Sequence, residues 1–234
     1  MVVMEGTRHF ELALRAKIAH VLGARSVFGH LESTSLEGFA PVPSPDHADW
    51  ILRYKEDLSK AKNSDFVRHF ITKYDSQLPI WAAVEVTPFG RLTRLFDLMD
   101  KKDRNEIAQA FGLQSGGDRL SKWLKSVNYL RNLCAHHGRL WNATLLYEVG
   151  KFPPALVDDT LTHISSVPPP ADAAKLYRVL AVLAYMLRSS GAAEQWPASL
   201  ATQVKKLPTV ASQTPETNMG FPAGWRTLAL WAPA

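Results

Sequence analysis

Apolar residues recur every three or four positions along most of the chain, which is the period of an α-helix. The clearest run lies between Asp118 and Trp141, where there is no proline and Gly138 is the only glycine. Two glycines before it indicate a turn, and Asp118 is placed to cap the helix. The buried face of this helix is expected to consist of Leu120, Trp123, Leu124, Val127, Leu130 and Cys134.

The same spacing predicts further helices that end at proline and glycine. They are expected over residues 1–24, 47–61, 65–74, 79–99 with a break at Pro88, 103–111, 157–165, 171–189 and 199–206. Apolar residues between Met219 and Trp231 predict a C-terminal tail that docks on the core. No segment alternates as a strand does between hairpin turns. The pattern therefore predicts an all-α protein, a bundle of about four long helices with smaller helices around it.

The first predicted helix has its own pattern of apolar and charged residues. Its apolar face is expected to consist of Leu12, Ile18, Val21 and Leu22. Glu11 and Arg15 lie four residues apart, so we expect an ion pair between them on the helix surface.

A polar face accompanies the apolar face of the helix that begins at Asp118. Its members follow one another at steps of three or four residues: Lys125, Asn128, Asn132, His136 and Arg139. Arg131 falls at the edge of the buried face, where a long side chain can bury its stem and keep its charged head outside. His137 faces another direction on an ideal helix.

The residue types of this polar face suit phosphodiester chemistry. Histidine donates and accepts protons near neutral pH, arginine binds phosphate through a planar fork, and asparagine can orient a hydroxyl or an imidazole. No acidic residue lies between Asp118 and Glu148, so a divalent cation would find few ligands there. We therefore expect neither a metal nor another cofactor. The alternative is a solvated helix face without chemistry, and spacing alone leaves both open.

Arg131-Asn132, followed after three residues by His136, resembles the motif of the HEPN superfamily of ribonucleases. The longer string LRNLCAHHGRLWN resembles the signature of the Abi-like family, which is associated with abortive infection, a form of phage resistance. Three further segments resemble that family in the same order: FELALRAKIAH, PIWAAVEVTPFGRLTRLF and MGFPAGWRTLALW. The resemblance covers most of the chain and implies a HEPN-like helical bundle.

The resemblance implies a metal-independent endoribonuclease in which a ribose 2′-OH attacks the adjacent phosphate. His136 would act as general base or acid, Arg131 would stabilise phosphate charge, and Asn132 would orient His136 or the substrate. The RNA would also be bound by Lys125, Asn128, His137 and Arg139. HEPN enzymes usually place two motifs side by side across a dimer. With one copy in the chain, we expect a symmetric homodimer with a composite active site.

Two other functions stay open. A HEPN-like bundle can be a catalytically inactive module that binds RNA or protein, and Abi-like proteins usually carry a segment ahead of the first helix that this chain is expected to lack. The chain can also be a toxin silenced by a regulatory RNA or protein. Some HEPN toxins are silenced by modification of a tyrosine two residues after the motif histidine. Here that position is Gly138, which argues against this particular control.

Composition adds limits on partners and location. A net charge of +5 and a pI of about 9.3 are compatible with an acidic partner such as RNA. The single cysteine excludes an internal disulfide and fits a reducing cytosol. No apolar run approaches about 18 residues, and no signal-peptide core is seen. We expect a cytoplasmic protein without a membrane span, with a HEPN-like core at residues 1–165 and C-terminal helices and tail at residues 166–234 packed on it.

Overall fold

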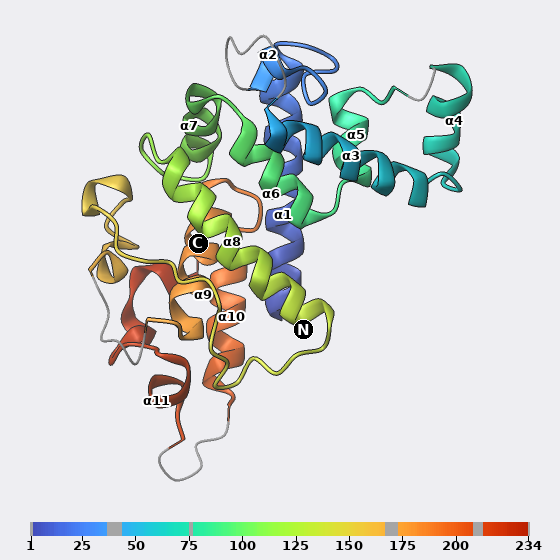
Figure 1. Cartoon of the computed structure of the whole chain (residues 1–234). Helices are drawn as coiled ribbons and strands as arrows, with labels where there is room; N and C mark the ends of the chain where they lie inside the picture. Colours follow the sequence, from blue (N-terminus) through green and yellow to red (C-terminus); the bar gives the residue numbers. More distant parts are fainter. Residues whose placement is uncertain (1, 37–43, 75–76, 167–172, 208–212, 234) are drawn as a thin grey trace. The chain divides into compact units, whose positions relative to one another are not determined.

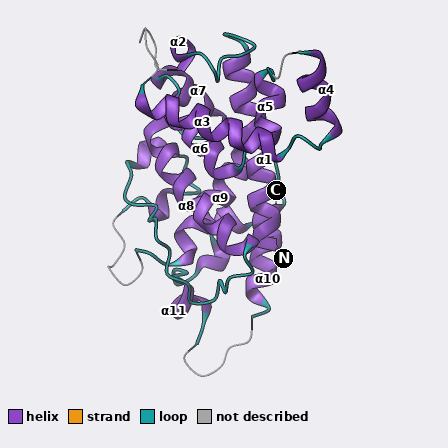
Figure 2. Cartoon of the chain, turned by 45° about the vertical axis from the view of Figure 1, so that its right-hand side comes forward, coloured by secondary structure: helices purple, strands orange, loops and turns teal. Residues whose placement is uncertain are grey.

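The structure is a computed structural model that describes residues 2–36, 44–74, 77–166, 173–207 and 213–233 (Figure 1). Its regular elements are helices, and Figure 2 shows no strand in the described part of the chain. An isolated antiparallel bridge joins Thr144 and Lys175. The predicted all-α class is therefore confirmed.

The described helices belong to two compact units. Unit 1 consists of Met1–Ala13 and Ala108–Ala234, and unit 2 consists of Leu14–Ile107. Helix α1 (Val2–Gly23) begins in unit 1 and continues into unit 2, whereas α7 (Lys101–Ala110) ends in unit 1. The division expected from the sequence, at residues 165 and 166, is a different one and stays a prediction.

The core of unit 1 contains a helix that is buried on all sides. The twelve residues from Leu176 to Leu187 in α9 (Leu176–Ser189) are all buried, as expected for a helix that is almost entirely apolar. Besides α7 and the start of α1, the other described α-helices of this unit are α8 (Gly117–Ala135), α10 (Trp196–Lys205) and α11 (Pro215–Met219). Both α8 and α10 pack on α9. The helix with the predicted polar face therefore rests on the most buried element of the unit.

The C-terminal tail docks on α9, as predicted. The 3-10 helices η4 (Trp225–Thr227) and η5 (Ala229–Trp231) bring apolar rings into the core. The ring centroids of Phe221 and Tyr177 are 4.7 Å apart, and Trp231 Nε1 donates to the Tyr177 hydroxyl at 3.4 Å. The first tail residues, 208–212, lie outside the described part of the chain.

The single helix predicted over residues 157–165 is wrong. Residues 157–161 form a bend and a turn, with the short 3-10 helices η1 (Pro154–Leu156) before them and η2 (Thr162–Ile164) after them. The Asp158 carboxylate accepts hydrogen bonds from the amide and the hydroxyl of Thr160, at 2.9 and 2.6 Å. This local side-chain contact holds the backbone in a turn and competes with helix formation.

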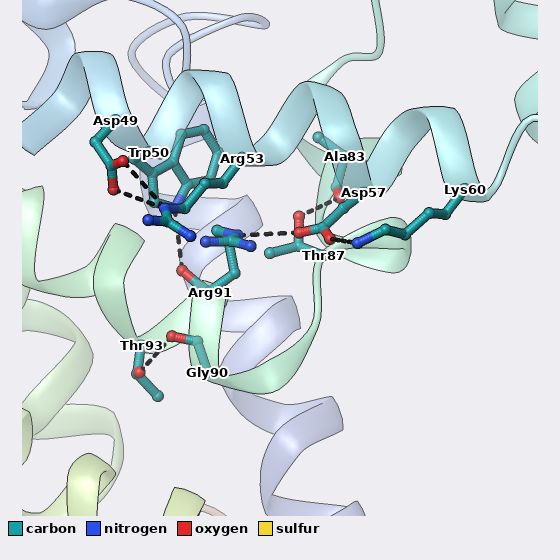
Figure 3. Close-up of polar contacts among 10 residues, drawn as sticks. All are labelled: Asp49, Trp50, Arg53, Asp57, Lys60, Ala83, Thr87, Gly90, Arg91 and Thr93. Atoms are coloured by element: carbon teal, nitrogen blue, oxygen red, sulfur yellow. Dashed lines mark hydrogen bonds and ion pairs between the residues drawn. The ribbon is translucent and has the colours of Figure 1, made fainter.

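Unit 2 joins two helices through a small polar network (Figure 3). Arg91 Nε donates to the buried carboxylate of Asp57 at 3.0 Å, and Trp50 Nε1 donates to the Arg91 carbonyl at 3.0 Å. Lys60 adds a second cation, 3.7 Å from Asp57. The α-helices described wholly within unit 2 are α2 (Ser33–Leu36), α3 (Pro45–Lys60), α4 (Asp65–Lys73), α5 (Ile80–Val86) and α6 (Phe89–Leu98). The network therefore ties α3 to α6 around a buried carboxylate with two cationic partners.

The predicted break at Pro88 is confirmed, because α5 ends at Val86 and α6 begins at Phe89. Proline has no amide hydrogen and disfavours helical geometry in the residue before it. The hydroxyl of that residue, Thr87, donates to the Ala83 carbonyl at 2.7 Å and satisfies one acceptor in the last turn of α5.

Unit 2 is expected to lose stability in weak acid because of a buried histidine. His30 is fully buried against the rings of Trp50 and Tyr54, and burial, followed by the charge of His47, lowers its pKa from 6.5 to about 4. Below pH 6.5 the unfolded chain binds a proton that the folded unit does not bind. Stability is therefore complete above pH 6.5 and is lost as the pH falls towards 4, by about 3 kcal/mol in total. Amide hydrogen exchange in α3 at pH 7 and pH 4.5 measures this loss.

A matched variant, His30→Phe, keeps an aromatic ring in the same space but cannot be protonated. Its opening free energy in α3 should vary much less with pH. Parallel pH curves for the two proteins would show that another group causes the acid sensitivity.

Candidate functional site

Helix α8 carries the predicted site and ends earlier than the sequence suggested. The helix was expected to continue to Trp141, but its last residue is Ala135. At its end, the amide of His137 donates to the Cys134 carbonyl at 3.1 Å, and the amide of Gly138 donates to the Leu133 carbonyl at 2.7 Å. These two bonds, with His137 at a left-handed φ of 56°, form a Schellman cap. The cap satisfies carbonyl groups of the last turn and directs the chain away from the helix axis.

The other end of α8 also differs from the prediction. The residue before the helix is Gly116, and no side chain caps it. Asp118 lies one residue inside the helix, in its first turn, so its predicted role as the cap is wrong. A carboxylate in the first turn still interacts favourably with the helix dipole.

Gly138 fits the cap because it has no side chain. A Cβ atom at this position would lie 2.2 Å from Leu133 Cδ1 and 2.9 Å from the Leu133 carbonyl oxygen. Any other residue would push against both the side chain and the backbone of the last helical turn. The glycine therefore lets the chain fold back tightly beside His136 and His137.

The predicted polar face extends as far as the cap. Lys125, Asn132 and His136 are exposed, and Asn128 is partly exposed. Asn132 and His136 are four residues apart, and the hydrogen bond from the His136 amide to the Asn132 carbonyl, 3.0 Å long, preserves the helical turn between them. The structure thus brings Asn132 and His136 to one side of the helix end.

Arg139 and His137 do not belong to this helical face. The prediction that Arg139 continues the stripe is wrong, because the chain has left the helix at His137. Both side chains are nevertheless exposed near the helix end. Their contact with a substrate stays a prediction.

Arg131 is held by a partner that the sequence did not indicate. Its Nε lies 3.3 Å from a carboxylate oxygen of Glu11 on α1, and the two side chains are 31% and 12% exposed. The expectation that Glu11 lies on the helix surface is therefore wrong. Nε is the only Arg131 nitrogen in this contact, so the terminal nitrogens of the partly exposed guanidinium remain suited to a phosphate.

The position of Glu11 has a recognisable cause in the first helix. Phe10, Leu14 and Ile18 are fully buried and follow one another at four-residue steps. Glu11 lies beside this stripe, whereas Leu12, expected on the apolar face, is 61% exposed. The four-residue spacing of Phe10 and the apolar residues after it indicates a buried stripe with Glu11 at its edge. Arg131 has the same kind of position on α8.

Arg131 and His136 leave α8 in different directions. Five residues on an α-helix correspond to a rotation of about 140°. Among the described residues, no hydrogen bond or ion pair joins these two side chains. Within one chain the structure therefore presents two groups: Asn132 with His136, and Arg131 with Glu11.

The described residues contain no group of three or more His, Cys, Asp or Glu side chains arranged to hold a metal ion. No described helix combines the length and apolar character needed to cross a lipid bilayer. Independence from metals and other cofactors stays a prediction.

A family model described as "Abi-like protein" matches residues 1–142. The match begins with the helix that carries Glu11 and ends just after the cap of α8, and it covers more than half of the 234 residues. The chain belongs to the Abi-like family. The curated proteins and the solved structures contain no match.

Both groups of candidate residues in this Abi-like protein lie inside the matched span. Glu11 stands near its beginning, and Arg131, Asn132 and His136 stand near its end. The contact between Glu11 and Arg131 joins the two ends of the span within unit 1. The resemblance to the Abi-like family is confirmed, while the roles assigned to these residues stay predictions.

The cap of α8 in this Abi-like protein can be tested by Gly138→Ala. The added methyl would meet Leu133, so we expect the variant to lose about 1–3 kcal/mol of stability, as measured by urea denaturation. Part of this loss should disappear in a Leu133→Ala background, because that change removes the Cγ and Cδ1 atoms beside the new methyl. Equal losses in both backgrounds would show that the close approach to the Leu133 side chain is not the cause.

Proposed function

We propose that this protein is a metal-independent endoribonuclease of the HEPN type that acts in phage defence. The observation that supports it most is the end of α8, where Asn132 and His136 are exposed on one side and the adjacent Arg131 is oriented by a mostly buried carboxylate. The segment around them has five basic residues and no acidic one between Asp118 and Glu148: Arg119, Lys122, Lys125, Arg131 and Arg139. This charge pattern suits a polyanion.

The proposed reaction is an attack of the substrate on itself. The ribose 2′-oxygen forms a bond to the adjacent phosphorus, and the bond from phosphorus to the 5′-oxygen of the next nucleotide breaks. His136 either accepts the proton of the 2′-OH or donates a proton to the departing 5′-oxygen, and water serves the other oxygen. Arg131 stabilises the charge on the phosphate, and Asn132 orients the imidazole or the ribose. The products are a 2′,3′-cyclic phosphate and a 5′-hydroxyl.

The directions of the side chains favour a site made from two chains. The reaction needs an arginine and a proton-transferring histidine around one phosphate. A single α8 sends Arg131 and His136 about 140° apart. A symmetric dimer can place Arg131 of one chain beside His136 of the other.

A second candidate is a binding module without catalysis. It is favoured by the absence of a described bond between Arg131 and His136, since such a surface can bind RNA or a protein without being arranged for chemistry. The two candidates differ in His136→Ala. An enzyme loses cleavage and keeps RNA affinity, whereas a module loses at most binding.

Cleavage is expected to persist in EDTA and to stop when the scissile nucleotide carries 2′-hydrogen in place of 2′-hydroxyl. The attacking oxygen belongs to the RNA, so the proposed reaction needs no metal-bound water but cannot proceed without the 2′-OH. Electrophoresis of end-labelled single-stranded RNA, with chemical analysis of the new ends, measures both effects. Strict dependence on Mg²⁺, or products with a 5′-phosphate, would contradict this mechanism even if the protein cuts RNA.

A further inference from the structure

The chain that follows the α8 cap returns along the helix (Figure 1). Tyr147 contacts Tyr129, two turns before the helix end, and further back Arg119 donates to the Val149 carbonyl at 3.4 Å. The ring of Phe152 meets that of Trp123 at a centroid distance of 5.2 Å. The returning chain is thus fixed beside α8 along several turns, and Tyr147 lies close to the exposed part of the helix.

Tyr147 and its neighbour place apolar surface in solvent. Tyr147 is 45% exposed and Leu146 is 69% exposed. The centroids of the Tyr147 and Tyr129 rings are 6.2 Å apart, and their planes are inclined by 76°. In such an edge-to-face pair, at most one face of either ring is covered by the other. Tyr147 is therefore supported at one side and keeps ring surface for another partner.

The ring pair lies in line with the candidate catalytic residues. Tyr129 precedes Asn132 by three positions and His136 by seven, so all three point to the same side of α8. Seven residues correspond to about 10 Å along the helix axis. The pair is therefore close enough to contact a nucleotide that flanks the one being cut, and too far away to touch the reacting phosphate.

We propose that Tyr147, supported by Tyr129, is a stacking surface for an unpaired RNA base next to the cleavage site; this rests on the proposed ribonuclease function. Exposed aromatic rings beside basic side chains are the usual means of binding single-stranded nucleic acid, because every base has a flat face. Here Lys125 lies one turn before Tyr129 on the same face and is exposed, so it can contact the backbone of the same strand.

The proposal defines a substrate class. A base inside a duplex is stacked on its neighbours and is not available to Tyr147, so the protein should bind unpaired stretches of RNA and discriminate against duplexes. Stacking on a tyrosine reads little of the base identity. This surface therefore selects single-stranded RNA over duplex RNA and does not select a base sequence.

The test compares the affinities of two RNAs for the protein that carries His136→Ala, a change that prevents cleavage during the measurement. One is a short labelled single-stranded RNA, and the other has the same ribose-phosphate backbone with the bases removed. Fluorescence anisotropy gives the affinity of each RNA for His136→Ala alone and with Tyr147→Leu or Tyr147→Phe added. Tyr147→Leu should weaken binding of the normal RNA by roughly 5- to 150-fold and leave the abasic RNA unaffected, while Tyr147→Phe should leave both unchanged.

Three outcomes overturn the proposal. Equal weakening for both RNAs would show that Tyr147 supports the backbone contacts or the local structure. No weakening would show that it does not touch a base. A change from dimer to monomer in sedimentation of Tyr147→Leu would show that the ring is covered by a second copy of the chain.

Different results would contradict the stacking surface alone and the proposed ribonuclease function. If wild-type protein cuts RNA and Tyr147→Leu has no effect on affinity, only the stacking surface is wrong. If wild type cuts no RNA and His136→Ala binds neither RNA, the ribonuclease function and the stacking surface are both wrong. Because Tyr147 is 45% exposed, its replacement should not unfold the protein, and a thermal melt verifies this.

Discussion

Replacing His136 by alanine is expected to reduce the rate of RNA cleavage by about 10²–10⁴-fold, the usual contribution of a group that transfers protons in catalysis. The melting temperature should stay the same, because His136 is exposed and lies just after the last residue of α8. Its backbone amide would still donate to the Asn132 carbonyl. Initial rates on a fluorescent single-stranded RNA, together with thermal melts, measure the two effects.

His9 provides a matched control for this experiment. It is another exposed histidine of unit 1, on α1, with a side chain that is 45% exposed. His9→Ala should cut RNA at the wild-type rate. Full activity in His136→Ala would remove His136 from the site, and a large loss in His9→Ala would show that the assay responds to general surface charge.

Two inactive variants are expected to restore activity when they are combined. Arg131→Ala and His136→Ala should each be nearly inactive alone. If each site takes Arg131 from one chain and His136 from the other, a mixed dimer contains one intact site. Free exchange makes half of the dimers mixed, so co-expression should give about a quarter of the wild-type rate. Relative to either variant alone, this is a gain of one or more orders of magnitude, measured in the same cleavage assay.

The control replaces one of the two partners by the double variant Arg131→Ala with His136→Ala. Co-expression of this chain with His136→Ala should remain inactive, because no pairing supplies an imidazole. If the two single variants form mixed dimers but show no recovery, the proposed composite site is wrong. Each site then needs Arg131 and His136 from the same chain, or it needs both copies of each residue.

The buried face of α8 could be predicted from the sequence because it depends only on local spacing. Leu120, Trp123, Leu124, Val127 and Leu130 are fully buried, and Cys134 is 7% exposed. The break at Pro88 was likewise predictable, since proline acts on its own and the preceding residue. In both cases the information lies within a few positions of the feature that it determines.

The end of α8 was not predictable in the same way. A left-handed residue after a helix is usually glycine, but here it is His137, and the glycine follows one position later. The contact that explains Gly138 is with the side chain and carbonyl of Leu133, which no spacing rule includes. The helix was therefore extended too far, and Arg139 was placed on a face that ends before it.

Glu11 was missed for a different reason. Its partner Arg131 is 120 residues away, whereas Arg15 is four residues away and offers a simple local explanation. Residue spacing within one helix gives no information about a partner on another helix, because that contact depends on how α1 and α8 pack. The candidate site was thus found on the segment that carries its motif, and the residue that orients Arg131 became visible only in three dimensions.

The discontinuity of unit 1 has a consequence for the protein's synthesis. A ribosome makes Met1–Ala13 before unit 2, and it makes unit 2 before the remainder of unit 1. At 5–20 residues per second, roughly ten seconds separate the appearance of Glu11 from that of Arg131, and α9, on which α8 packs, emerges later still. The contact between Glu11 and Arg131 therefore forms late in the synthesis of the chain. Peptides released before Arg131 has been made lack this contact, so an activity that depends on it cannot begin earlier in synthesis.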